Sequence, residues 1–209
     1  MKDKTKLRLV EEQIGEHEER YYGFVYTSHL RRRDINTNER EYKGLHFYKD
    51  NSLYLVSMAH GQMAGIGLAY FPQIGLYEGD FNDGKRFGTG KLVAHSKQCF
   101  IGYWKNDIQE GFGVEISEKG ERYQGFFVQG KKHGKGKYTW ANGDFYAGTF
   151  KNDVVEGQGY MNCANGRTYT GQWKDGQPNG QGTIEYATGE EYEGELKGWV
   201  KHGKGKFIM

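Results

Sequence analysis

The sequence has little proline, little cysteine and no excess of either charge. Two prolines in 209 residues are too few for a disordered, proline-rich linker. The two cysteines, Cys99 and Cys163, do not make a disulfide framework, and we expect reduced thiols in a cytosolic protein. The formal net charge is only +2, from 29 basic and 27 acidic residues. A nucleic-acid-binding protein would show a strong basic excess, so we expect no nucleic acid among the partners.

Long apolar runs and catalytic motifs are also missing. No stretch is apolar for long enough to span a bilayer, and the charged start MKDKTKLRLVEEQ lacks the apolar segment of a secretory signal. The Gly-x-Gly pairs lack the third glycine of a dinucleotide-binding loop, and Gly130–Lys137 lacks the ending of a phosphate loop. His133 and His202 fall roughly 29 Å apart along the predicted sheet, too far to share a metal ion. We therefore expect no catalytic residue, no metal site and no cofactor.

Glycine and aromatic residues are abundant instead. The chain has 33 glycines, and 15% of its residues are aromatic. Disordered chains contain few aromatic residues, so this composition predicts a folded protein. Glycine and aromatic residues at fixed spacing are typical of short β-strands joined by tight turns.

The spacing is a repeat of 23 residues. A Tyr-x-Gly or Phe-x-Gly motif begins at Tyr77, Phe100, Tyr123, Tyr146, Tyr169 and Tyr192. A Gly-x-Gly pair follows in each unit, as at Gly134 and Gly136. Asn142-Gly143 then provides a strong signal for a tight turn. Self-similarity at such a period indicates a repeat architecture.

Alternation within each unit predicts which residues face the core. The first, third and fifth residues of the motif share one face of a strand, and glycine at the third leaves room for neighbouring rings. The second and fourth residues are mostly polar and should face water. The residues that we assign to the structural repeat are Tyr77, Gly79, Phe81, Trp104, Gly125, Phe127, Gly134, Gly136, Tyr146, Gly148, Tyr169, Gly171, Trp173, Tyr192 and Gly194.

One unit departs from this alternation on its second strand. Glu115 and Ser117 occupy slots that are apolar or aromatic in other units, whereas the apolar Val114 and Ile116 lie in the polar slots. A slip by one residue turns every side chain over to the other face. We therefore expect either a β-bulge or a local partner at this point.

The repeat predicts an all-β fold, an elongated meander of about eight stacked antiparallel hairpins in one curved, twisted sheet with a groove. Residues 1–20 are predicted to form an N-terminal arm, which is either a short helix or an extended segment that orders on a partner, or else a frayed terminus. Residues 21–53 are a degenerate repeat that carries a basic loop insertion. Residues 54–209 are seven 23-residue units, of which the unit at Tyr54 is weakened because Val56 replaces the glycine.

These residues closely resemble the MORN repeat family (membrane occupation and recognition nexus). The resemblance is firm over 54–209 and looser over 21–53. It implies stacked β-hairpins that form an elongated, curved sheet with a groove. Family members serve mainly as scaffolds in ciliary radial spokes and at cytoskeletal and junctional membrane sites, or as modules beside catalytic domains.

Two kinds of segment are candidates for binding a partner. The basic candidates are Arg31, Arg32, Arg33 and Arg40 in the loop insertion and Lys131 and Lys132 in the central repeat. The apolar candidates are Phe207, Ile208 and Met209, which lie on the last strand. An edge strand presents unpaired N–H and C=O groups, so we expect this segment to contact a second chain.

The leading hypothesis from the sequence is a non-enzymatic scaffold subunit that binds other protein subunits of a large cytosolic assembly. By family resemblance, the assembly is a cilium or flagellum axoneme, specifically a radial-spoke head. The alternative is a peripheral membrane module whose basic loops bind anionic phosphoinositide lipids. Co-sedimentation with liposomes, with and without anionic lipid, separates the two hypotheses.

Overall fold

The structure is a computed structural model of the chain, and it describes residues 7–14, 19–26, 42–59 and 62–209. The chain divides into two compact units, Met1–Ile108 and Gln109–Met209. All of the regular secondary structure in the described residues is antiparallel β-strand. This finding confirms the predicted all-β class and the meander of stacked hairpins.

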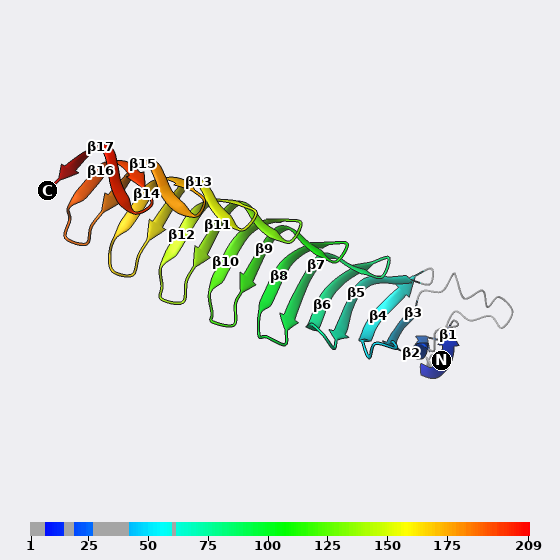
Figure 1. The fold of residues 1–209 in the computed structure, drawn as a ribbon. Helices are drawn as coiled ribbons and strands as arrows, with labels where there is room; N and C mark the ends of the chain where they lie inside the picture. The colour runs from blue at the N-terminus through cyan, green and yellow to red at the C-terminus, as the bar shows by residue number, and fades with distance from the viewer. Residues whose placement is uncertain (1–6, 15–18, 27–41, 60–61) are drawn as a thin grey trace, which may run out of the picture. The chain divides into compact units, whose positions relative to one another are not determined.

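The first unit contains eight strands, each paired with the next one in chain order (Figure 1). Their bounds are β1 Leu7–Ile14, β2 Glu19–Tyr26, β3 Tyr42–Phe47, β4 Leu53–Ala59, β5 Gln62–Phe71, β6 Gly75–Asn82, β7 Lys85–Ala94 and β8 Cys99–Lys105. For the N-terminal arm we expected either a helix or an extended segment. Leu7–Ile14 is extended, and it pairs with β2 of the same chain.

The second unit continues the same pattern, with each strand paired to the next. Its strands are β9 Ile108–Ile116, β10 Arg122–Val128, β11 Lys131–Thr139, β12 Phe145–Lys151, β13 Val154–Asn162, β14 Thr168–Lys174, β15 Gln177–Glu185, β16 Glu191–Lys197 and β17 Val200–Ile208. Backbone hydrogen bonds join the turns of successive repeats. The Asp153 N–H, for example, donates to the Lys132 carbonyl at 2.9 Å.

A β-bulge interrupts the hairpins β6–β7, β10–β11, β12–β13, β14–β15 and β16–β17 next to their glycine pairs. In β10–β11 the pairing passes from Gly125 with Gly136 to Phe126 with His133, so two residues of β11 lie outside the ladder. Gly134, at this point, has a φ of +64°, a conformation that side chains other than glycine rarely adopt. The weaker hairpins at the N-terminal end keep the register, because Gly23 pairs with Gly44 as Gly148 pairs with Gly159.

The motif tyrosine folds over this glycine pair. A Cβ atom added to Gly125 would lie 2.7 Å from the Gly136 Cα, so only glycine fits here. The Tyr123 hydroxyl then donates a hydrogen bond to the Phe126 carbonyl at 3.0 Å. The same bond recurs from Tyr77, Tyr146, Tyr169 and Tyr192. Burial of these hydroxyls raises the pKa of Tyr123, Tyr146 and Tyr169 to about 12.

In both units, aromatic rings fill the side of the strands on which the motif tyrosines lie, which we call the tyrosine face. In the second unit the Tyr146 ring meets Phe150 and Trp173 edge-on, with centroids 5.3 Å and 5.0 Å apart. In the first unit Tyr77 meets Phe81 and Trp104 in the same way. These side chains are almost fully buried, which agrees with the predicted core positions. Edge-to-face contacts of this kind are favourable beyond the area that they bury.

The repeat at Tyr54 shows how the side chains pack when the third slot of the motif is not glycine. Val56 is fully buried in the third slot of the motif. Its side chain takes the space that the tyrosine ring occupies in the other units. The Tyr54 ring instead packs against Tyr48 and Phe71, with centroids 5.1 Å and 5.5 Å away. The hairpin and its bulge persist, because the register shift falls between Leu55 and Ser57, next to Val56.

Candidate interaction surfaces

The described residues contain neither a cluster of metal-ligating side chains nor a membrane-spanning helix. Within residues 7–14, 19–26, 42–59 and 62–209, no group of three or more His, Cys, Asp or Glu side chains could hold a metal ion. No helix in these residues is long and apolar enough to cross a membrane.

The basic residues predicted from the sequence have different outcomes. Arg31, Arg32, Arg33 and Arg40 lie outside the described residues. Lys131 is exposed at the start of β11. The Lys132 side chain is only 16% exposed, and its ammonium group forms an ion pair with Glu115. Partner binding by Lys131 and Lys132 remains a prediction.

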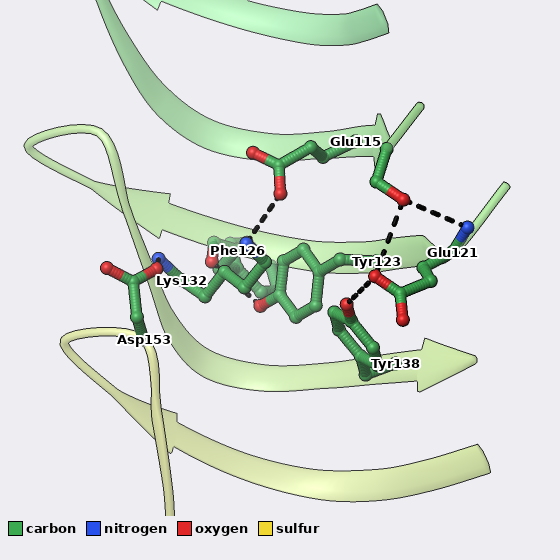
Figure 2. A network of polar contacts seen from close by, with 8 residues as sticks. Glu115, Glu121, Tyr123, Phe126, Lys132, Tyr138 and Asp153 are labelled. Carbon is green, nitrogen blue, oxygen red and sulfur yellow. Dashed lines mark hydrogen bonds and ion pairs between the residues drawn. The ribbon is translucent and has the colours of Figure 1, made fainter. Parts of the chain in front are cut away.

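Figure 2 shows the polar network around Lys132. Its Nζ lies 2.5 Å from Glu115 Oε1 and 5.4 Å from the centre of the Tyr123 ring. Its backbone N–H donates to Asp153 Oδ1 at 2.9 Å. The lysine thereby covers the buried tyrosine while its charge is neutralised on the same face.

This network also explains the slipped unit. We expected a bulge or a local partner for Glu115 and Ser117, and the structure shows local partners. Pairing between β9 and β10 is regular from Gly111 to Ile116. Glu115 lies opposite Tyr123 and finds Lys132, while the Ser117 hydroxyl accepts the Glu121 N–H at 3.1 Å. The Tyr138 hydroxyl donates to Glu121 Oε2 at 3.0 Å. Burial is the larger cause, and this hydrogen bond the smaller, of a rise in the pKa of Tyr138 to about 12.

The C-terminal residues are exposed, as the edge-strand hypothesis requires. Phe207 is 46% exposed and Met209 is 99% exposed, whereas Ile208 is partly buried. The Phe207 ring lies under Lys201 Nζ, 4.4 Å from its centroid. Contact between this segment and a second chain remains a prediction.

One exposed apolar surface was not predicted from the sequence. It lies on the face of the first unit opposite the tyrosine face, where water was expected to meet polar side chains. Its members are between 37% and 69% exposed. They are Leu55, Ile66, Leu68, Tyr70, Leu76, Val93, Ile101 and Tyr103, which we call the apolar patch.

Strand register makes this patch continuous. Leu55 lies opposite Leu68 on the neighbouring strand, and Tyr70 lies opposite Leu76. Leu76 in turn lies opposite Val93. Directly opposed side chains on one face are within contact distance, so β4, β5, β6 and β7 contribute to one surface. On β8, Ile101 and Tyr103 lie on the same face, opposite Lys91 and Thr89.

The same repeat slots are polar in the Tyr169 repeat of the second unit. Around Tyr169 they hold Thr168, Thr170, Thr183 and Glu185. The repeat itself therefore does not require apolar residues at these slots. A comparison of the slots between units would have revealed the patch in the sequence, whereas the consensus alone concealed it.

The sequence model of the MORN repeat matches residues 77–95, 100–122, 123–145, 146–166, 169–191 and 192–209. These six matches cover more than half of the chain, and the chain therefore belongs to the MORN-repeat family. The MORN repeat is a non-enzymatic repeat module. None of the curated protein sequences compared with the chain matches it.

Solved structures with a similar fold include the TCP10 domain of Danio rerio CPAP. It shares 12% identity with this chain at a TM-score of 0.52, and the match covers 96% of this chain and 87% of that one. The TCP domain of Drosophila melanogaster SAS-4, solved in complex with a proline-rich motif of Ana2, shares 14% identity at a TM-score of 0.45. That match covers 80% of this chain and 96% of the other. At such identities the likeness concerns the fold alone.

Proposed function

We propose that this protein is a non-enzymatic scaffold that holds a protein subunit against the apolar patch of its first unit. The carrying observation is a continuous, exposed and apolar sheet face that the repeat does not need for folding. The occupant is a protein surface that is itself apolar. Charges near the patch largely compensate each other, because Glu78 and Lys91 lie opposite one another across β6 and β7.

The size of the patch fits a protein interface. Eight half-exposed large side chains present on the order of 600 Å² of apolar surface, the upper range for the largest patch on an ordinary monomer. A specific protein interface buries about 800 Å² on each partner, so the patch can form most of one contact. Burial of an apolar surface of this size would be a strong driving force for association.

For the assembly itself, we propose a ciliary or flagellar axoneme, with a radial-spoke head as the specific location. The support is membership of a family whose members act as scaffolds in radial spokes and at other cytoskeletal sites. The alternative proposal is that the chain binds anionic lipid through the basic candidates Arg31, Arg32 and Arg33. Co-sedimentation of the full chain with phosphoinositide-containing liposomes tests this alternative.

The patch can be tested with charge substitutions at matched slots. The variant Leu68→Lys/Ile101→Lys places two cations in the patch. Its control, Thr183→Lys/Thr170→Lys, changes the same two repeat slots in the second unit. Each tagged full chain is expressed in ciliated cells and cross-linked, and the proteins captured by the wild type are quantified for each variant. Thermal unfolding first establishes that both variants are folded.

We expect the patch variant to lose the partners that the wild type and the control both retain, and to leave the axonemal fraction. Equal recovery of every partner by the patch variant would disprove the proposed surface. If patch-dependent partners are found but the wild type is absent from axonemes, the scaffold proposal stands and the ciliary assignment fails.

A further inference from the structure

A second exposed apolar feature lies in the other unit. Phe112 of β9 and Phe126 of β10 lie directly opposite each other on the face away from the tyrosines. Their rings meet edge-on, with centroids 5.7 Å apart. The two side chains are 50% and 49% exposed, although an exposed aromatic pair contributes little to a core.

The slot of Phe126 has a structural use elsewhere in the repeat. Asp80 occupies this slot in the Tyr77 repeat, where its Oδ2 accepts the Thr89 N–H at 3.0 Å. The carboxylate thus provides a hydrogen-bond acceptor for a backbone N–H at the bulge. Gln172 does the same for the Gln181 N–H at 2.9 Å. Phe126 cannot accept a hydrogen bond, so the corresponding Lys135 N–H receives no side-chain acceptor from this slot. The phenylalanine thus replaces a useful cap with exposed apolar surface, which indicates a role outside folding.

Basic side chains adjoin this pair on the same face. Strand register places Lys137 opposite Gln124 and Lys131 opposite Val128, in line with Phe126. Lys135 lies on this face opposite Thr149 of β12. All three lysines are exposed, and none forms an ion pair within the part of the chain that the structure describes.

One glutamate of β9–β11 lies on this face, against the three lysines. Glu110 of β9 uses its carboxylate to accept the Gln129 N–H at 3.1 Å. Glu115 and Glu121 lie on the tyrosine face, where they bind Lys132 and Tyr138. The face that carries Phe126 is therefore aromatic on β9–β10 and basic on β11.

We propose that this face of β9–β11 binds an acidic protein segment that carries a large apolar anchor. The anchor, an aromatic or long aliphatic side chain, packs on the Phe112–Phe126 pair. Carboxylates of the same segment meet Lys131, Lys135 and Lys137. Lys135 and Lys137 are two residues apart on one strand, about 6.8 Å, which matches alternate side chains of an extended peptide. Complementary charge steers such a segment to the site and the anchor fixes its position.

The position of Lys137 favours a peptide over a membrane surface. Its Nζ lies over the Phe145 ring, 3.9 Å from the centroid, so the charge is held close to the sheet. A carboxylate on a segment lying against the sheet reaches this ammonium group. Lipid headgroups are met by lysines that extend away from the protein, which Lys137 does not do.

The repeat supplies a matched control for the lysines. Lys204 and Lys206 occupy the slots of Lys135 and Lys137 in the last unit, where Glu195 takes the place of Phe126. The test variants of the full chain are Phe126→Thr and Lys135→Glu/Lys137→Glu, and the control is Lys204→Glu/Lys206→Glu. Threonine is chosen because Thr149 occupies the Phe126 slot in the next unit. Thermal unfolding verifies the fold of each protein.

The probes are arrayed peptides of twelve residues with alternating glutamates and one central Phe, Trp or Leu. Matched peptides replace every Glu by Gln or the central residue by Ala. We expect the anchored acidic peptides to bind at least about tenfold more tightly than either matched set, with affinity falling as salt rises. Phe126→Thr and Lys135→Glu/Lys137→Glu should each weaken this binding at least about fivefold, and the control should not.

Equal binding of the acidic and neutral peptides, or equal loss in the control, would overturn the proposal. Sedimentation with phosphatidylserine vesicles that depends on Phe126 and Lys135 would also overturn it if the peptides do not bind, and would assign the face to membranes. This site is independent of the apolar patch. The variant Leu68→Lys/Ile101→Lys should leave peptide binding unchanged, so failure of one proposal is distinguishable from failure of the other.

Discussion

The Tyr146 hydroxyl donates a hydrogen bond to the backbone carbonyl of Thr149 at 3.2 Å, three residues further along the same strand. The bulge makes this bond possible, because the ladder passes from Gly148 to Phe150 and leaves Thr149 without a partner on β13. The tyrosine ring must cross Gly148 and Gly159 to reach that carbonyl, and a Cβ on either residue would obstruct it. The three features of the repeat, tyrosine, glycine pair and bulge, thus depend on one another.

The variant Tyr146→Phe tests the hydrogen bond alone. It removes the hydroxyl and keeps the ring, so the part-buried Thr149 carbonyl loses this donor. We expect a loss of about 0.5–1.5 kcal/mol in the free energy of unfolding, measured by urea denaturation. Tyr103→Phe is the control, because the Tyr103 ring is exposed on the opposite face and should change stability little. Equal stability of wild type and Tyr146→Phe would show that water replaces the bond.

The variant Gly125→Val tests the space under the ring. A Cβ at Gly125 meets the Gly136 backbone at 2.7 Å, and backbone cannot move away as a flexible side chain can. We expect a loss of about 1–3 kcal/mol from overpacking. Gln124→Val, at the neighbouring exposed position, should stay within about 0.5 kcal/mol of the wild type. Similar melting temperatures for the two variants would contradict the face assignment.

Much of this fold follows from periodicity in the sequence. The step of 23 residues predicts the hairpins, and the alternation in Tyr123-x-Gly125-x-Phe127 predicts the buried face correctly. Periodicity reports what the units share, so it could not predict what distinguishes one unit from another. The ion pair of Lys132 with Glu115 joins residues of two neighbouring repeats, and only strand register brings them together. The exposed Phe126 was hidden in the same way by a consensus slot described as mostly polar.

A double-mutant cycle can measure the ion pair between Lys132 and Glu115. Both side chains are partly buried, so we expect Lys132→Met and Glu115→Gln to be coupled by about 1 kcal/mol, at the upper end for exposed pairs. The coupling should weaken as salt is added. Lys201→Met is the control, because Ile184 replaces the glutamate in the equivalent slot of its neighbouring hairpin. Additive effects of Lys132→Met and Glu115→Gln would indicate that Lys132 acts only by covering Tyr123.

Burial of His46 should make the stability of the first unit depend on pH. It lies on β3 opposite Tyr54 and is 7% exposed. Burial lowers the pKa of His46 from its ordinary value of 6.5 to about 4. Between these two values the unfolded chain binds a proton that the folded chain does not. Stability therefore falls as the pH is lowered from about 6.5 to about 4, and the contribution of His46 levels off below that.

The measurement is urea unfolding of the wild type and His46→Gln at several values between pH 7.5 and pH 4. His46→Gln can change stability at every pH, so the informative quantity is the slope of the unfolding free energy against pH. We expect a shallower slope in His46→Gln than in the wild type. His202→Gln, at an exposed position on β17, should keep the wild-type slope. Parallel curves for the wild type and His46→Gln would mean that burial of His46 does not control its protonation.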